Sequence, residues 1–305
     1  MMLILMAVKN GARYLPAQLG SLTEPLRAGW RLRLSDDGSE DGSPGLLRRF
    51  AARWPQGQVQ IGAGPGQGAA AHFLALLADL PEVPGPVALA DQDDIWLPGK
   101  LARAQALLSR VPGHVPAFVH ARRVNWDVSG GLYWPSAHPA RPPCFENALL
   151  ENVAFGNTLV LNPAAARLVR QVAPQAAGIY AHDWFLYQLL TGAGALCLYD
   201  PVPAVLYRLH GGNAIGCSRG LRGWLARKRA VLRGRYARRI DAQLTALLAC
   251  RAALTPENRT TLEAFAAARR APGLRRLGTF RKLGLFRQTR QGRLGFWGGA
   301  LLGLV

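Results

Sequence analysis

Short apolar runs alternate with helix-like segments through the first ninety residues. The runs at residues 3–8, 30–35, 59–61 and 87–90 have the length and composition of buried strands. The segments between them, around residues 14–22, 46–54 and 70–80, repeat their apolar positions at helical intervals. Repeated strand–helix–strand units of this kind predict an α/β fold.

The pattern is less regular between residues 100 and 215. A helix is expected to begin near Lys100, after Pro98, and an apolar helix is expected to open at Asp183 and run to Leu190. Residues 152–161 indicate a further buried strand. The aromatic-rich and proline-rich segment 121–155 has poor periodicity, so it predicts either a loop region facing a substrate or an irregular packed connection.

Composition narrows the class of protein. A chain of 305 residues with 50% hydrophobic content holds one large domain and an appendage, or two small domains. Its four cysteines form no Cys-x-x-Cys pair, which predicts reduced thiols in the cytoplasm. Lys9 interrupts the apolar amino terminus, which therefore indicates a strand and not a signal peptide. The sequence contains no run of about 18 uncharged apolar residues, so no membrane-spanning helix is expected.

Positive charge is concentrated at the carboxyl end. Residues 1–215 contain 17 Lys and Arg against 15 Asp and Glu, so the remaining residues hold 20 basic and 3 acidic side chains of the totals 37 and 18. The two parts therefore carry net charges of +2 and +17. We expect a nearly neutral body over residues 1–216 and a basic helical extension over 217–305.

The basic extension predicts a partner with negative charge. Residues 221–248 have apolar positions at helical intervals between arginines, as in helices that lie on anionic membranes. The second basic segment, 269–293, precedes an apolar terminus that is too short to span a bilayer. A helical subdomain packed on the body is the alternative. Nucleic-acid binding is the rival function, and the neutrality of the body argues against it.

Two acidic motifs follow predicted strands of the body. Asp36 and Asp37 come after the second strand, and Asp91, Asp93 and Asp94 come after the strand at 87–90. Ligands of open α/β sheets bind at the carboxyl ends of strands, so both motifs are expected to face one crevice. Closely spaced carboxylates need a compensating cation, and Mg²⁺ or Mn²⁺ is commonly held by one or two carboxylates together with substrate phosphates. The pattern predicts a metal and diphosphate site.

Five motifs in order give the chain a family resemblance. They are Asn10-Gly11 with Tyr14-Leu15 and Gln18-Leu19, Asp36 to Ser43, Asp91 to Pro98, His182-Asp183-Trp184, and Tyr207 to Asn213. Over residues 2–216 the chain resembles glycosyltransferase family 2, in its bacterial rhamnosyltransferase-like branch. The resemblance implies a GT-A fold, in which a Rossmann-like mixed sheet is flanked by helices. It also implies a nucleotide-sugar donor, a divalent cation and inversion at the anomeric carbon.

The resemblance also implies roles for the first two acidic motifs. Asp37, with Asp36 and Asn10, is expected to bind the donor nucleotide, and Asp91 to lie near its ribose. Asp93 is the expected metal ligand. Asp94 is expected to cap the helix near Lys100 or to support the loop, and not to bind the metal.

Further roles fall in the later motifs. Asp183 matches the family's catalytic base, which takes a proton from the acceptor hydroxyl, although a carboxylate at this position also suits helix capping. His182, Arg208 and His210 are candidate contacts to the diphosphate or the acceptor. The chain has Val8-Lys9-Asn10 where the family commonly has Thr-Tyr-Asn, which leaves the nucleobase undetermined.

These observations predict a metal-dependent, inverting glycosyltransferase. Its donor is a nucleotide-sugar, with dTDP-rhamnose suggested by the resemblance alone, and its acceptor is a saccharide or a polyisoprenyl-linked intermediate. The expected setting is bacterial surface polysaccharide synthesis at the cytoplasmic face of the plasma membrane. An anionic membrane surface is the expected partner of the basic extension.

Overall fold

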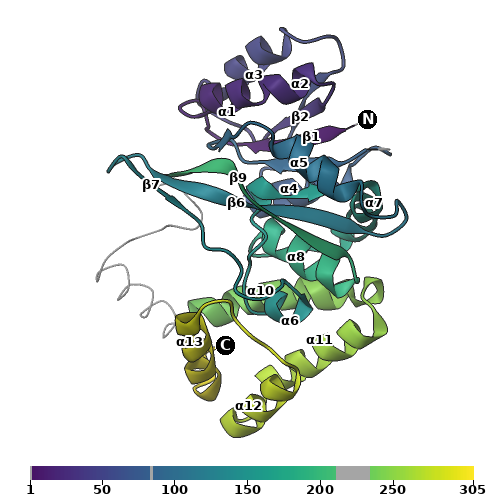
Figure 1. Cartoon of the computed structure of the whole chain (residues 1–305), viewed down its shortest axis with the longest axis vertical. Coiled ribbons are helices and arrows are strands. Elements are labelled where there is room, and N and C mark those ends of the chain that lie inside the picture. The colour runs from purple at the N-terminus through teal and green to yellow at the C-terminus, as the bar shows by residue number, and fades with distance from the viewer. Residues whose placement is uncertain (1, 83–84, 211–233) are drawn as a thin grey trace. The chain divides into compact units, whose positions relative to one another are not determined.

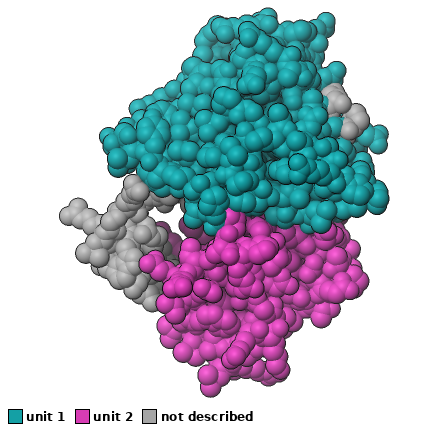
Figure 2. Space-filling model, viewed as in Figure 1, with its two compact units in different colours: residues 1–138, 154–174, 195–210 teal, residues 139–153, 175–194, 211–305 magenta. Residues whose placement is uncertain are grey.

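A computed structural model describes residues 2–82, 85–210 and 234–305. The chain forms two compact units (Figure 2). Unit 1 comprises Met1–His138, Ala154–Pro174 and Ala195–His210, and unit 2 comprises Pro139–Val153, Gln175–Gly194 and Gly211–Val305. The predicted boundary near residue 216 falls in the segment 211–233, outside the described residues, so it stays a prediction.

Unit 1 is built on a mixed sheet (Figure 1). Among the described residues the sheet has nine strands in the order β3-β2-β1-β4-β8-β6-β9-β5, with β7 paired to β6. Strands β3, β2, β1 and β4 are parallel, and β8 pairs antiparallel with both β4 and β6. The strands are β1 (Leu3–Val8), β2 (Arg31–Asp36), β3 (Val59–Ala63), β4 (Val87–Ala90), β5 (Ile95–Trp96), β6 (Ala117–Asp127), β7 (Leu132–Pro135), β8 (Val160–Leu161) and β9 (Leu196–Leu209).

Helices supply the apolar surface that buries this sheet. The alternate residues Ile4, Met6 and Val8 of β1 join one core that includes side chains of α1, α2, α3 and α5. Helix α4 contacts β1, and α7 contacts β6, β8 and α4. All six residues of β1 are buried, as expected for a central parallel strand. The helices of this unit are α1 (Leu15–Ser21), α2 (Thr23–Arg27), α3 (Ser43–Ala51), α4 (Ala69–Ala78), α5 (Lys100–Leu108) and α7 (Pro163–Val172), with short 3₁₀ turns at η1 (Gly156–Thr158) and η2 (Ala173–Gln175).

The predicted alternation of strands and helices is confirmed over the first ninety residues. Strands β1 and β4 have the expected bounds, and β2 is displaced by one residue from the predicted segment 30–35. The helix near Lys100 is also confirmed. Its N-cap residue is Gly99, so the capping role considered for Asp94 is wrong.

The expectation of an irregular segment over residues 121–155 is wrong in its first part. Strand β6 continues to Asp127 and forms a hairpin with β7, in which Trp126 pairs with Tyr133. The two rings stack with centroids 5.7 Å apart. Exposed β7 carries apolar and aromatic residues without a clean polar alternation, so the period-two signal was lost.

The buried strand expected over residues 152–161 is also wrong in extent. Only Val160 and Leu161 pair as a strand, and the 3₁₀ turn η1 precedes them. The segment is buried, but Asn157 makes side-chain and backbone hydrogen bonds inside unit 1 that replace a regular ladder. Burial was predicted correctly and the backbone conformation was not.

Unit 2 is helical. Its helices are α6 (Phe145–Ala148), α8 (His182–Gly192), α10 (Arg235–Ala249), α11 (Pro256–Arg269), α12 (Gly273–Lys282) and α13 (Arg290–Leu301), with a 3₁₀ turn at η3 (Arg251–Ala253). Phe280 lies between two other buried rings, 5.3 Å from Phe265 and 5.6 Å from Phe296 between centroids. These rings give α11, α12 and α13 a common core.

The described half of the predicted amphipathic helix 221–248 is α10, and residues 221–233 lie outside the described residues. Ile240, Leu244 and Leu247 of α10 are buried, and the helix packs against α8. Its apolar side chains therefore contribute to the core of unit 2. None of the helices in the described ranges is both long and apolar enough to cross a bilayer.

Glycine positions in the two units allow a test of packing. A Cβ at Gly192 would lie 2.8 Å from side-chain atoms of both Leu254 and Phe145. We expect Gly192→Ala to lower the free energy of unfolding by about 1–3 kcal/mol because the core around α8 must shift. A Cβ at Gly20 would meet no atom of the described chain within 4 Å, so Gly20→Ala should stabilise α1 by about 0.5–1 kcal/mol. Urea unfolding of both variants measures the difference, and equal effects would contradict the packing at Gly192.

Candidate functional site

Three loops of unit 1 meet at one edge of the sheet. Strand β1 lies between β2 and β4 and runs parallel to both, so the segments that follow these strands share the edge formed by their carboxyl ends. Val8 at the end of β1 is in register with Asp36 at the end of β2. The two acidic motifs lie at this edge, as the sequence predicted.

The loop after β1 is fastened to both neighbours. The backbone N–H of Lys9 donates to Oε1 of Gln92, and Nε2 of Gln92 donates to the carbonyl of Lys9, each at 2.9 Å. The Lys9 ammonium donates to the carbonyls of Asp37 at 3.0 Å and Gly38 at 2.5 Å. The Lys9 ammonium therefore stabilises the loop after β2. In the resemblance to glycosyltransferase family 2, Lys9 aligns with a position that is commonly Tyr.

Asn10 completes the connection between these two loops. Its backbone has a positive φ of 49°, and it is the one non-glycine residue of the described chain in this region of φ. The backbone N–H of Asn10 donates to Oγ of Ser39, and its Oδ1 accepts from the N–H of Glu40, both at 2.8 Å. Asn10 thus orders the loop that was predicted to bind the nucleotide.

Asp36 and Asp37 have different partners. Asp36 accepts hydrogen bonds from the hydroxyl and the N–H of Ser39, a local turn typical of aspartate. Asp37 is only 5% exposed, and its carboxylate accepts from the N–H of Gly66 at 2.7 Å and of Gly68 at 3.3 Å. It therefore fixes the turn between β3 and α4.

His72 of α4 lies behind Asp37. Its Nδ1 is 3.8 Å from Oδ1 of Asp37, and its Nε2 is 2.7 Å from the Ser35 hydroxyl. Burial lowers the pKa of His72, while the charges of Asp37 and Asp36 act in the opposite direction. His72 is therefore held by the Ser35 hydroxyl and packs behind the Asp37 carboxylate without a hydrogen bond to it.

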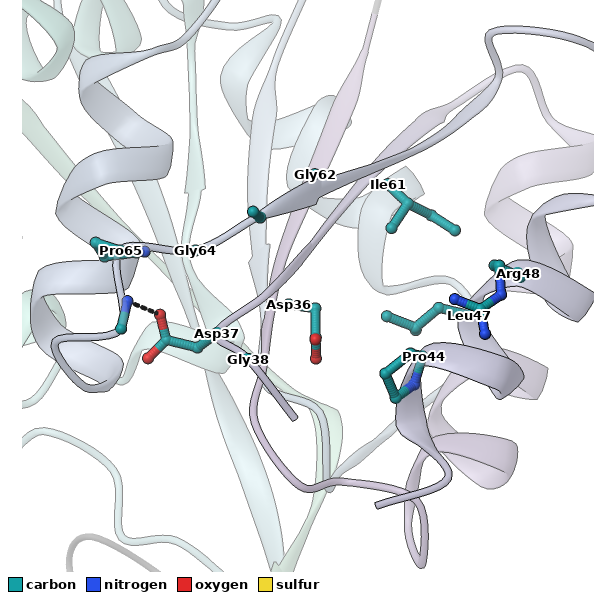
Figure 3. Close-up of a pocket in the computed structure, with 12 residues that line it drawn as sticks. Asp36, Asp37, Gly38, Pro44, Leu47, Arg48, Ile61, Gly62, Gly64 and Pro65 are labelled. Atoms are coloured by element: carbon teal, nitrogen blue, oxygen red, sulfur yellow. Dashed lines mark hydrogen bonds between the residues drawn. The ribbon is translucent and has the colours of Figure 1, made fainter. Parts of the chain in front are cut away.

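A pocket of about 480 Å³ opens beside these carboxylates (Figure 3). Asp36 and Asp37 lie on one side of it, and Leu47 and Arg48 of α3 lie on the other. Its volume is within the range of small-molecule pockets, roughly 300–1,000 Å³. Apolar walls with two carboxylates and one guanidinium are suited to a flat polar ring such as a nucleobase.

The loop after β4 meets the end of β9. Oδ2 of Asp93 lies 2.9 Å from Nε2 of His210, and these side chains are 18% and 16% exposed. The Arg208 guanidinium donates to the carbonyl of Asp93 at 2.9 Å, and the ring of Tyr14 stacks on His210 with centroids 4.5 Å apart. The structure thus brings Asp93, Arg208 and His210 together. Arg208 contacts the backbone of the loop after β4.

The residues present fit a divalent cation that is shared with a substrate. Within the described residues no three His, Cys, Asp or Glu side chains gather closely enough to hold a metal. Asp93 and His210 offer one oxygen and one nitrogen on a partly open side, and Asp91 lies in the same loop, where its carbonyl accepts from Gln18. Protein sites with this few ligands leave coordination positions for phosphate oxygens and water.

Asp94 is completely buried and supports the loop from within. Its Oδ2 accepts from the Asn157 amide at 2.5 Å, and its Oδ1 accepts from the Arg208 N–H at 3.2 Å. Burial raises the pKa of Asp94 to about 7, the neighbouring charge of Asp93 adds to the rise, and the two hydrogen bonds oppose it. The Asp94 carboxylate joins the loop after β4 to η1 and β9.

Lys100 belongs to the same buried cluster. Its ammonium donates to the Asn157 carbonyl at 2.5 Å and lies 3.3 Å from the centre of the Trp96 ring. Burial lowers the pKa of Lys100 well below its ordinary value, while the nearby charges of Asp94 and Asp91 raise it. The sequence placed Asn157 near the acceptor site and gave Lys100 only the start of a helix. The hydrogen bonds of Asn157 to Lys100 and Asp94 were not predicted, because each joins residues more than fifty positions apart.

Asp183 and His182 lie in unit 2, at the first turn of α8. Asp183 accepts from the N–H of Trp184 at 2.7 Å, a contact within its own turn. Burial lowers the pKa of His182, and the charge of Asp183 raises it. Every residue of α8 from Trp184 to Gly192 is buried, so the helix is a rigid base for Asp183.

The segment that leads into α8 is held by α10. Fully buried Gln243 accepts from the N–H groups of Tyr180 at 2.8 Å and Ala181 at 3.3 Å, and it donates to the Ala181 carbonyl at 3.2 Å. One side chain of the basic extension therefore fixes the approach to Asp183. This role has no signature in the sequence, because an isolated Gln on a helix has no characteristic spacing.

No protein-family model matches the chain. Among curated proteins, it is similar to a dTDP-rhamnosyl transferase, RfbG of Shigella flexneri. The two are 25% identical over 226 residues, which is 70% of this chain and 74% of the relative. This likeness supports the glycosyltransferase resemblance found in the motifs.

Solved structures show the fold. TarS 1-349 of S. aureus in complex with UDP-GlcNAc has a TM-score of 0.52 at 12% identity, covering 92% of this chain and 90% of that chain. The mannosyltransferase PcManGT of Pyrobaculum calidifontis, in complex with GDP-Man and Mn²⁺, has a TM-score of 0.50 at 18% identity, covering 99% and 85%. The GT-A fold expected from the sequence is confirmed.

The buried carboxylate of Asp94 predicts a dependence of stability on pH. Its pKa is 3.8 when unperturbed and about 7 in the folded chain, so the folded state binds more protons between these values. Through this group the free energy of unfolding should fall as pH rises from about 4 to about 7, by at most about 1.4 kcal/mol per pH unit. Asp94→Asn removes this contribution, so its stability relative to wild type should increase with pH over that window.

Urea unfolding at several pH values from 4.5 to 7.5 measures the two curves. Asp79→Asn is the matched control, because the Asp79 side chain is 74% exposed and pairs with Arg33 at the surface of unit 1. This variant keeps Asp94, so its stability should still fall over the pH window assigned to Asp94. If the Asp94→Asn curve is parallel to wild type, Asp94 is ionised across the whole range and the raised pKa is wrong.

Proposed function

We propose that this chain, similar in sequence and fold to family 2 glycosyltransferases, transfers a sugar from a nucleotide-sugar donor to an acceptor hydroxyl. The observation that carries the proposal is the pairing of Asp93 with His210 at the sheet edge where the Asp36–Asp37 motif also lies. A GT-A fold and a curated rhamnosyl transferase relative support the same reaction class.

A divalent cation, Mg²⁺ or Mn²⁺, belongs to the proposed reaction. Asp93 would supply a carboxylate ligand and His210 an imidazole ligand beside it. The cation would stabilise the negative charge that develops on the departing diphosphate. Arg208 holds the Asp93 backbone, and its hydrogen bond keeps the carboxylate at the end of β9. A neighbour of the same fold was solved with GDP-Man and Mn²⁺, which supports the choice of metal.

The donor nucleotide is proposed to occupy the edge formed by the loops after β1, β2 and β4. Asp37 and Asp36 line the pocket in which a base would lie, Asn10 orders the loop beside it, and Asp91 would face the ribose. The name of the curated relative makes dTDP-rhamnose the first donor to test.

Asp183 is the proposed base of an inverting displacement. In that step the acceptor oxygen bonds to the anomeric carbon, the bond from that carbon to the diphosphate oxygen breaks, and the acceptor proton passes to the Asp183 carboxylate. His182 would contact the acceptor or orient Asp183. The buried length of α8 and the Gln243 contacts support a fixed carboxylate position.

The acceptor is proposed to be a saccharide or a polyisoprenyl-linked intermediate in surface polysaccharide synthesis. Such an acceptor would place the reaction at the inner face of the plasma membrane, with the basic region 217–305 against anionic lipid. The net charge of +17 in residues 216–305 supports this setting.

Asp93→Asn tests the metal assignment. Loss of one carboxylate ligand should weaken Mn²⁺ binding and reduce turnover of dTDP-rhamnose by about 10²-fold or more, because the diphosphate loses its compensating charge. Mn²⁺ titration followed by electron paramagnetic resonance measures the affinity, and donor hydrolysis measures turnover. Asp79→Asn should leave both unchanged. Unaltered Mn²⁺ affinity in Asp93→Asn would contradict the assignment of Asp93 as a metal ligand.

Asp183→Asn tests the base. Transfer to an acceptor should fall by about 10²–10⁴-fold, whereas donor and Mn²⁺ affinities should stay at wild-type values. A loss of transfer rate with unchanged donor and Mn²⁺ affinities distinguishes a catalytic base from a residue that shapes the donor site. The control Asp241→Asn changes a carboxylate of unit 2 whose side chain is 59% exposed. Wild-type transfer by Asp183→Asn would leave the carboxylate with a purely structural role.

A further inference from the structure

Helices α12 and α13 lie at the yellow end of the colour scale in Figure 1. These two helices and the residue after α13 carry an unusual number of exposed leucines. Leu274 is 80% exposed, Leu294 76%, Leu302 69% and Leu301 49%. Single exposed apolar side chains are common on soluble proteins, but four within thirty residues of one helical pair are not explained by chance exposure. We name these four residues the leucine ridge.

The leucines stay outside because other faces of the helices form the core. Phe280 of α12 and Phe296 of α13 are buried and stacked on each other. Buried Arg276 donates to the Ala300 carbonyl at 2.6 Å and to the Ala271 carbonyl at 2.7 Å. The two helices are thus fixed together without the leucine ridge.

The members of the ridge lie close to one another. Leu294 and Leu301 are seven residues apart on α13, which places them on the same side of a helix. A Cβ at Gly273, next to Leu274, would lie 2.6 Å from the Leu301 carbonyl and 3.3 Å from its Cδ1. The start of α12 therefore touches the end of α13, and the exposed leucines of both helices form one apolar strip.

The surroundings of the ridge carry charge of one sign. Residues 264–305 contain nine Lys and Arg and no Asp or Glu. Five of these basic side chains are exposed on the same two helices: Arg275, Arg281, Lys282, Arg290 and Arg293. Leucines that can enter an acyl layer, next to cations that can meet lipid phosphates, have the composition of an interfacial membrane surface.

We propose that the leucine ridge and its five basic neighbours bind the surface of an anionic membrane. The proposal rests on the proposed function, in that a lipid-linked acceptor needs the enzyme at a bilayer, and it assigns the contact to α12 and α13. The apolar face of α10, in the segment first predicted to lie on the membrane, is occupied within unit 2.

The composition of the leucine ridge favours lipid over nucleic acid as its partner. Both partners attract arginines, but single-stranded nucleic acid also needs aromatic faces on which bases stack. The exposed large hydrophobic side chains of the described residues 234–305 are all leucines. Leucine side chains are stabilised when they enter the hydrocarbon of a bilayer, and they have no group that hydrogen-bonds to a base. The exposed leucines therefore favour a membrane as the partner.

Vesicle co-sedimentation of the full chain tests the proposal. Wild type should bind vesicles of phosphatidylglycerol and phosphatidylcholine in equal parts, and bind pure phosphatidylcholine vesicles much more weakly. Leu274→Ser with Leu294→Ser should reduce binding to the anionic vesicles by about tenfold or more, because apolar burial drives interfacial insertion. The control Leu132→Ser with Leu196→Ser changes two leucines of unit 1 that are 52% and 45% exposed, and should bind as wild type does.

Three further measurements serve as controls for the vesicle experiment. Circular dichroism and thermal unfolding should be the same for both double variants and wild type, since the substituted side chains are exposed. Donor hydrolysis without vesicles should also be unchanged, so failure of membrane binding is separable from failure of the proposed function. Equal vesicle binding by the ridge variant and wild type overturns the proposal. It is also overturned if the chain binds single-stranded RNA more tightly than anionic vesicles and the leucine substitutions leave that RNA binding unchanged.

Discussion

The buried contact between Asp94 and Asn157 is the constraint on which the candidate site depends. A carboxylate with no exposure is costly to bury unless hydrogen bonds compensate it, and Asp94 has an amide and a backbone N–H as donors. Those donors come from η1 and β9. The acidic loop after β4 is therefore placed by residues far along the chain, and Asp93 is aligned with His210 as a result.

The sequence predicted those parts of the site that follow from local periodicity. Strand ends can be located from apolar runs, so the sequence alone predicts that the Asp36 and Asp93 motifs share one edge of the sheet. The pairing of Asp93 with His210 joins residues 117 positions apart and depends on β9 lying beside β5 and β6. The resemblance supplied His210 as a candidate, but only the sheet order gives its partner. The hairpin at Trp126 and Tyr133 was missed because cross-strand stacking has no short-range signature.

Many of the polar residues expected at the donor site hold protein atoms. Asn10 and Asp37 bond to backbone groups of neighbouring loops, and Asp36 bonds to the Ser39 hydroxyl within its own loop. A site whose loops are fixed in this way loses less conformational entropy when a ligand binds. The partly open pair of Asp93 and His210 differs, since its mutual contact can be exchanged for contacts to a cation. The acidic motifs thus divide into a scaffold and the proposed cation-binding pair of Asp93 and His210.

Gln243 changes how the basic extension should be regarded. Its side chain supplies the acceptor for the N–H groups of Tyr180 and Ala181, just ahead of the helix that carries Asp183. In evolutionary terms the carboxyl-terminal helices are therefore not a detachable module. A recombination event that replaced α10 together with α11, α12 and α13 would also leave those two N–H groups without the Gln243 acceptor. The surface proposed to bind membrane and the helix that carries Asp183 would therefore be inherited together.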